Sequence, residues 1–194
     1  MERCRAIIAA AILLASTRDG LAQNVALSEV VVAIHDTAAV TGDDLTAARI
    51  LTARVFGGAG VNIEWTASSA CSPGADAPFC VQVLLRPRNR ESAPGPRRVM
   101  GTALASDPGR AVLSLYFDAV TAVAVRYGMP RGEVLGLALA HEMGHVLLPP
   151  PSHDDTGIMQ PSWEGDDIRH VLAGDAVFTP AQALAIRARL ASRR

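Results

Sequence analysis

Two histidines and a glutamate stand close together in the second half of the chain, in the run His141-Glu142-Met143-Gly144-His145. The surrounding residues favour a helix, in which side chains four apart lie on the same face, one turn above the other. Both imidazoles can therefore reach one Zn²⁺ ion, and the Glu142 carboxylate projects beside it, where it can accept a proton from water. Because zinc lowers the pKa of such a water to about 7, the motif predicts hydrolytic chemistry with Glu142 as general base.

A third metal ligand must come from outside this motif, because a catalytic zinc normally takes three protein ligands and keeps one position for water. His153 is the nearest candidate, and it follows the stiff segment Pro149-Pro150-Pro151. An extended chain at ~3.1 Å per residue can easily bring His153 back from His145 to the metal. We predict His153 as the third ligand, with Asp154 or Asp155 as alternatives. Asp154 could instead accept a hydrogen bond from the ligand ring.

Glu164 offers a different plan, in which the third ligand is a glutamate on a later helix. It lies at a suitable distance along the chain, and Asp167 follows three residues later. However, Pro161, Gly165 and the lack of apolar periodicity argue against a helix here. The Glu164 plan therefore stands as the alternative to His153.

The run His141 to His145, a later histidine and the tripeptide Gly157-Ile158-Met159 together resemble the metzincin clan of zinc metallopeptidases. The spacing HExxH-x7-H followed by Gly-Ile-Met is similar to secreted bacterial members with a longer ligand loop. The chain departs from the clan's long form, whose glycine and third histidine would fall at Leu148 and Pro151. The resemblance covers residues 131–163. It implies that Met159 lies in a tight turn beneath the metal.

The resemblance also implies an activity, namely an exported zinc metalloendopeptidase in which Glu142 acts first as general base and then as acid. The substrate would be a peptide or protein, bound in a cleft between the sheet and the smaller part of the chain after Pro149. Two alternatives remain open. One is a secreted binding module with a structural zinc closed by Asp154 or Asp155 as fourth ligand. The other is a zinc hydrolase that acts on a non-peptide amide.

The elements that must position these residues predict an α/β (α+β) fold, a single domain with a mixed twisted sheet. Strands are expected at residues 29–35, 61–66, 81–86, 99–105 and 111–117, and helices at residues 45–56, 119–127, 131–147 or 148, and 179–194. Residues 99–105 are the candidate edge strand for pairing with an extended peptide. His35, at the end of a strand, and His170, in an irregular segment, are expected to be structural or exposed.

The first residues of the chain are typical of an export signal. Arg3 and Arg5 precede an apolar run over residues 6–15, and the small residues Gly20 and Ala22 follow at the spacing that a signal peptidase needs. We therefore expect a signal peptide at residues 1–22, a catalytic domain at residues 23–194, and a secreted or periplasmic location. The apolar run is too short for a permanent membrane span.

Two cysteines remain after removal of that signal, Cys71 and Cys80, with a turn-forming segment between them. In an exported chain this spacing predicts a disulfide. The chain has 194 residues, of which 49% are hydrophobic and 19% charged, with a formal net charge of −1. That composition supports a substantial core and gives no electrostatic case for nucleic acid or an anionic membrane. We expect a monomer.

Overall fold

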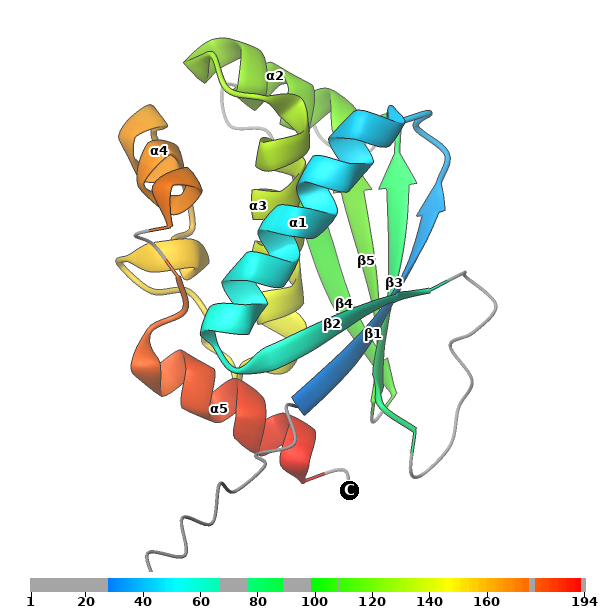
Figure 1. Ribbon diagram of the computed structural model, residues 1–194, viewed down its shortest axis with the longest axis vertical. Coiled ribbons are helices and arrows are strands. Elements are labelled where there is room, and N and C mark those ends of the chain that lie inside the picture. The colour runs from blue at the N-terminus through cyan, green and yellow to red at the C-terminus, as the bar shows by residue number, and fades with distance from the viewer. Residues whose placement is uncertain (1–27, 67–76, 89–98, 108, 175–176, 193–194) are drawn as a thin grey trace, which may run out of the picture.

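A computed structural model of the chain describes residues 28–66, 77–88, 99–107, 109–174 and 177–192 (Figure 1). The expected signal peptide at residues 1–22 lies outside the described residues, and so does Cys71. Cys80 lies buried in a strand and is disulfide-bonded. Its pairing with Cys71 stays a prediction.

The described residues form a mixed α/β structure with one five-stranded sheet. In chain order, the elements are β1 (Ser28–Asp36), α1 (Gly42–Gly58), β2 (Val61–Thr66), β3 (Phe79–Arg86), β4 (Gly101–Asp107), β5 (Arg110–Tyr116), α2 (Phe117–Tyr127), α3 (Arg131–Leu147), the 3₁₀ turn η2 (Gly157–Met159), α4 (Gly165–Ala173) and α5 (Pro180–Ala191). The expected mixed sheet is confirmed. Among the described residues, no helix is long and apolar enough to cross a membrane.

The strand order is β2-β1-β3-β5-β4, with β1, β2, β3 and β5 parallel and β4 antiparallel at the edge beside β5. Four consecutive residues of β1, Val30 to Ala33, are buried in this strand, which lies inside the sheet between β2 and β3. By contrast, β2 and β5 alternate between buried and more exposed positions. The expected edge strand at residues 99–105 is observed two residues later, as β4.

Helices α1 and α3 pack side by side against the sheet (Figure 1). Two glycines of α3 permit this contact. A Cβ on Gly132 would lie 2.6 Å from the Asp44 carbonyl oxygen, and one on Gly136 would lie 2.8 Å from the Ala48 carbonyl oxygen. Arg131 adds an ion pair to Asp44 at 2.9 Å. The backbone of α3, which carries the HExxH motif, is therefore held at close range by α1.

One prediction was wrong, because a helix does form where Gly165 and the missing periodicity argued against one. Glu164 is the N-cap of α4, and a reciprocal capping box joins it to Asp167. The helix has nine residues and buries Ile168 and Val171, spaced three apart. So short a helix shows too few apolar positions for a periodicity to be visible, and its cap supplies part of the stability instead.

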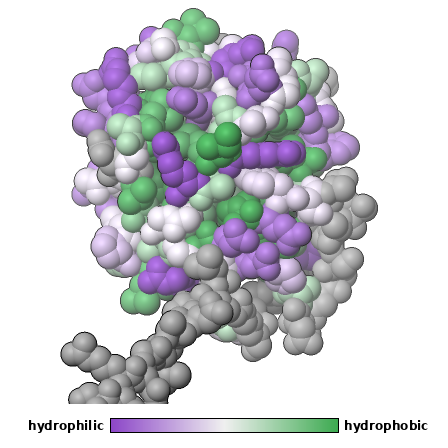
Figure 2. Space-filling view, viewed as in Figure 1, coloured by the Kyte–Doolittle hydropathy of each residue, from purple (hydrophilic) through white to green (hydrophobic). Residues whose placement is uncertain are grey.

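The final helix starts as predicted but ends at Ala191, before the predicted end at residue 194. Thr179 caps α5 and forms a capping box with Gln182, with Pro180 in the first turn. Figure 2 shows the face of the molecule that is turned to the viewer in Figure 1. On this face, hydrophobic side chains are separated by hydrophilic ones.

Candidate metal centre

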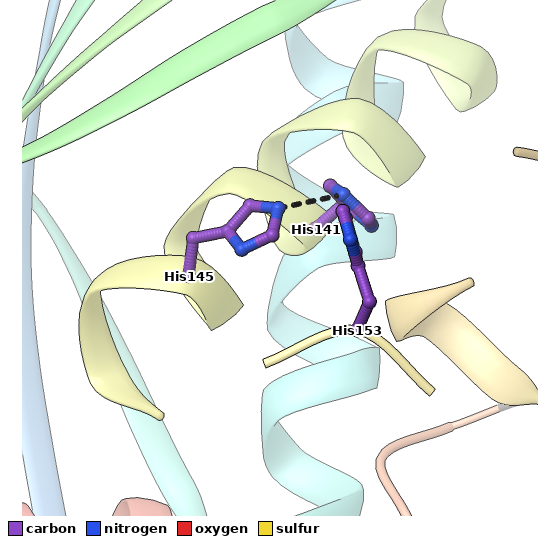
Figure 3. Close-up of side chains that lie close together, drawn as sticks. All are labelled: His141, His145 and His153. Carbon is purple, nitrogen blue, oxygen red and sulfur yellow. Dashed lines mark hydrogen bonds between the residues drawn. The ribbon is translucent and has the colours of Figure 1, made fainter. Parts of the chain in front are cut away.

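Three histidines meet beside α3. His141, His145 and His153 each offer one ring nitrogen, and these three atoms all lie within 4.8 Å of one another (Figure 3). The first two extend from one face of α3, and the third comes from the segment that follows the prolines. All three predicted ligands are therefore brought together at a distance that one metal ion could bridge.

The two helical histidines face each other through their Nε2 atoms. The Nε2 atoms of His141 and His145 are 3.0 Å apart. On the far side of its ring, His141 Nδ1 lies 2.8 Å from the carbonyl oxygen of Ile158. Because a carbonyl oxygen only accepts, Nδ1 carries the proton, and Nε2 of the neutral ring keeps its lone pair directed into the cluster. His145 Nδ1 lies 2.6 Å from Ser152 Oγ, a hydroxyl that can donate or accept, so this contact orients the His145 ring without fixing which nitrogen carries its proton.

Burial keeps these imidazoles uncharged. The pKa of His141 is lowered to about 4, mainly by burial and to a smaller extent by the neighbouring histidines, against the opposing effect of the Ile158 carbonyl. Burial also lowers the pKa of His145, followed in importance by the positive charge that His153 can carry. Neutral imidazole is the form that binds a metal, so both rings are ready to do so at neutral pH.

His153 reaches the cluster on an anchored loop. Its neighbour Asp154 donates its backbone N–H to the Met159 carbonyl at 3.0 Å and accepts a hydrogen bond from Gln182 Nε2 of α5 at 3.1 Å. The second carboxylate oxygen of Asp154 accepts from the Asp155 backbone N–H at 2.8 Å. Among the described residues, the group that could share a metal contains neither aspartate. Asp154 therefore anchors the loop instead of accepting from the His153 ring.

Glu164 also lies outside that group of described residues. Its carboxylate accepts a hydrogen bond from the Tyr127 hydroxyl at 2.8 Å and caps α4. His35 and His170, expected to be structural or exposed, are both exposed and lie outside the group as well.

Glu142 lies beside the histidines and is only 7% exposed. Burial raises its pKa to about 7, so near neutral pH this carboxylate can both take up and release a proton. Gly101, at the start of β4, has no side chain and so leaves room for the side chain of Glu142. A Cβ there would lie 2.6 Å from Glu142 Cγ and 2.7 Å from Leu115 Cδ2. Sequence reasoning missed Gly101, because only the pairing of β4 with β5 places it over the helix.

Met159 is fully buried at the end of η2. A Cβ on Gly144 would collide with the Met159 sulfur, so this methionine packs directly against the helical turn that carries His145. Its role as the floor of a metal site stays a prediction. The glycine within the HExxH motif has a clear steric purpose, which is to admit the Met159 side chain.

A cavity of about 820 Å³ opens beside the histidines and Glu142. Its walls are residues 99–103 at β4, one side of α2, the α3 motif and residues 160–164. Trp163 contributes to this wall and stands edge-on to the His141 ring, with 5.0 Å between ring centroids and 84° between planes. Sequence reasoning did not single out Trp163, because nothing in its local pattern links it to the motif.

Comparison with known proteins adds no assignment. No protein-family model matches the chain, and no curated protein matches it.

Proposed function

We propose that this protein is an exported zinc metallopeptidase in which His141, His145 and His153 hold Zn²⁺ and Glu142 is the general base. One observation carries the proposal, namely three imidazole nitrogens that converge next to a buried carboxylate at the wall of a cavity. When bound, zinc would supply a Lewis acid for the scissile carbonyl and a lowered pKa for water.

The donor set fits zinc. Imidazole is a ligand that suits Zn²⁺, and the ring nitrogens opposite the cluster are engaged by the Ile158 carbonyl and the Ser152 hydroxyl. Among the described residues, the group holds three ligands and no fourth. Three protein ligands are typical of a catalytic site, whereas a structural site is closed by four. This count favours the enzyme over the binding module with a structural zinc.

The surroundings of Glu142 support its role. Its raised pKa, about 7, lies close to the pH at which a general base must also act as an acid. We propose that Glu142 takes a proton from the attacking water and passes it to the leaving amine. A structural zinc site needs no such group beside it.

The edge of the sheet supports a peptide substrate. β4 pairs with β5 on one side and ends the strand order at that side of the sheet. An extended peptide could add to this edge as a further strand, next to Glu142 and along the cavity. The mixed sheet, the motif-bearing helix and a smaller C-terminal part ending in α5 are features that the metzincin resemblance implies.

The test is a digest of a broad peptide library by the purified chain loaded with zinc, read by mass spectrometry. Glu142→Gln should keep zinc and fold but lose activity by at least ~10²–10⁴-fold, since it removes the proton acceptor with little change in volume. Glu133→Gln, a change of the same kind in the first turn of α3, is the matched control and should cleave as the wild type does.

Two outcomes would contradict the proposal. One is a zinc-loaded wild type that leaves the whole library intact, as the structural-zinc alternative requires. The other is a Glu142→Gln variant that still cleaves peptides at near the wild-type rate.

A further inference from the structure

The cavity beside the histidines has two facing walls that meet through one side-chain hydrogen bond. One wall is the side of α2 that includes Tyr127, and the other is the segment of residues 160–164. Tyr127 Oη donates to Glu164 Oε2 at 2.8 Å, joining residues 37 apart in the chain. This bond directly connects the two walls.

The bond itself is exposed to solvent, but the Tyr127 ring packs closely against α4. A Cβ on Gly165 would lie 2.8 Å from Cδ1 of the Tyr127 ring, so the first residue of α4 rests against the tyrosine. The Arg126 guanidinium lies 5.3 Å from the centroid of the same ring. Glu164 is also the N-cap of α4, so its carboxylate fixes both the start of the helix and the hydroxyl of Tyr127.

The opposite end of α4 is held elsewhere. Arg54 of α1 donates from Nη2 to the carbonyl oxygens of Val171 and Leu172, at 3.3 and 2.8 Å. None of these three residues lines the cavity. Helix α4 is thus tied to α1 at one end and to α2 at the other, and only the second tie borders the cavity.

The chemistry of the walls indicates what could enter. Ala122 and Val123 of α2 and Ala138 of α3 are small and apolar, whereas the charged Arg126 and Glu164 are exposed. An apolar side chain could therefore bury against the alanines while the charged groups remain in water.

We propose that the hydrogen bond between Tyr127 and Glu164 sets the width of this cavity and limits the size of the apolar side chain that a ligand can place there. Tyr127 and Glu164 are then positioning residues for specificity. The inference rests on the proposed function for its substrate, a peptide, but concerns a step of binding that can be measured without catalysis.

The experiment uses the zinc-loaded full chain and a series of peptide hydroxamates whose one variable side chain grows from methyl through isobutyl and benzyl to naphthylmethyl. Binding is measured by calorimetry. In the wild type, affinity should rise along the series and fall for the largest member. In Tyr127→Phe, which keeps the ring but loses the hydroxyl, the largest member should gain about fivefold relative to the smallest, the equivalent of one net hydrogen bond.

Three further variants test whether the affinity profile depends on the hydrogen bond itself or on the stability of α4. Glu164→Asp keeps a capping carboxylate but is too short for Tyr127, so it should repeat the Tyr127→Phe profile. Glu164→Gln keeps a side chain of the same length with an oxygen that can accept from Tyr127, so it should keep the wild-type profile. Arg54→Met releases the other end of α4 and should leave the profile unchanged. All variants should bind zinc as the wild type does.

A Tyr127→Phe profile parallel to that of the wild type would overturn the inference, and so would the same shift in Arg54→Met. Failure of every hydroxamate to bind the zinc-loaded chain would also overturn it, because the cavity would then not receive ligands beside the metal. If the wild type and Tyr127→Phe gave the expected hydroxamate profiles but no peptide were cleaved, the inference would stand and the result would count against the proposed peptidase.

Discussion

Helix α3 and the segment from Pro149 to Glu164 both contribute to the metal centre, but they are held in different ways. α3 is buried along almost its whole length and packs against α1 through Gly132 and Gly136. The returning segment is largely irregular, and individual hydrogen bonds, such as those of Asp154, hold it together with the buried side chains of Ile158 and Met159. The comparison teaches that helix geometry and core packing position two of the proposed ligands, whereas the third depends on polar contacts together with the burial of Ile158 and Met159.

The largest expected effect is the loss of a ligand from either region. His153→Ala should lose zinc much as His141→Ala does, because all three imidazoles lie close enough together to hold one ion and are the proposed ligands. Glu164→Ala is the control and should retain it, since the Glu164 carboxylate contacts Tyr127 instead. Zinc binding by these variants is measured as the zinc content after dialysis and by competition with a chelator. If Glu164→Ala lost zinc and His153→Ala kept it, the metzincin assignment would be lost together with the ligand.

The next effect concerns a contact between the two regions. Ser152 belongs to the returning segment, and its Oγ lies 2.6 Å from His145 Nδ1. Ser152→Ala should weaken zinc binding by about 10–100-fold, as is typical when the partner of a ligand ring is removed. Ser162→Ala, in the same segment, is the matched control and should bind as the wild type does. An unchanged zinc affinity in Ser152→Ala would mean that core packing alone orients His145.

A smaller effect is expected where the segment packs against the helix. Gly144→Ala would force its Cβ into the Met159 sulfur, which is fully buried and has little room to move. Overpacking of this kind lowers the free energy of unfolding by about 1–3 kcal/mol. Gly57→Ala in α1, where a Cβ meets nothing within 4 Å, is the control and should not destabilise. Urea unfolding of the metal-free chains measures the difference, and equal midpoints for both variants would refute the contact.

The smallest effect concerns the protonation state of the His141 ring. Because burial lowers the pKa of His141 to about 4, the ring should be neutral in the metal-free protein at pH 5.5, with its proton on Nδ1 facing the Ile158 carbonyl. Nitrogen NMR of the imidazoles distinguishes the two tautomers and the charged form. A charged His141 at that pH, or a proton on Nε2, would contradict the described cluster.

The same contrast explains which features the sequence could predict. A period of four on one helix was enough to place His141 and His145 together, with Glu142 next to His141 in the chain. Apolar runs located the strands well, and β2 spans residues 61–66 as expected. His153 was predicted from ligand chemistry and reach, and it does lie in the cluster.

Contacts that depend on the path of the chain could not be predicted. Ile158 and Ser152 orient the ligand rings only because the segment folds back. The Gly157-Ile158-Met159 motif drew attention to Met159 but not to the Ile158 carbonyl, and no local pattern marks Ser152. Gly101 makes room for Glu142 because of the sheet order. Helix α4 as a whole was missed because capping, rather than a long apolar face, defines so short a helix.

The most direct test of the metal centre is a crystal structure of the zinc-loaded chain with anomalous diffraction data collected at the zinc absorption edge. The account predicts one strong peak bonded to His141 Nε2, His145 Nε2 and a ring nitrogen of His153, at about 2.0–2.1 Å, with no fourth protein ligand. A peak that is bonded to Glu164 in place of His153, or closed by Asp154 or Asp155 as a fourth ligand, would contradict it.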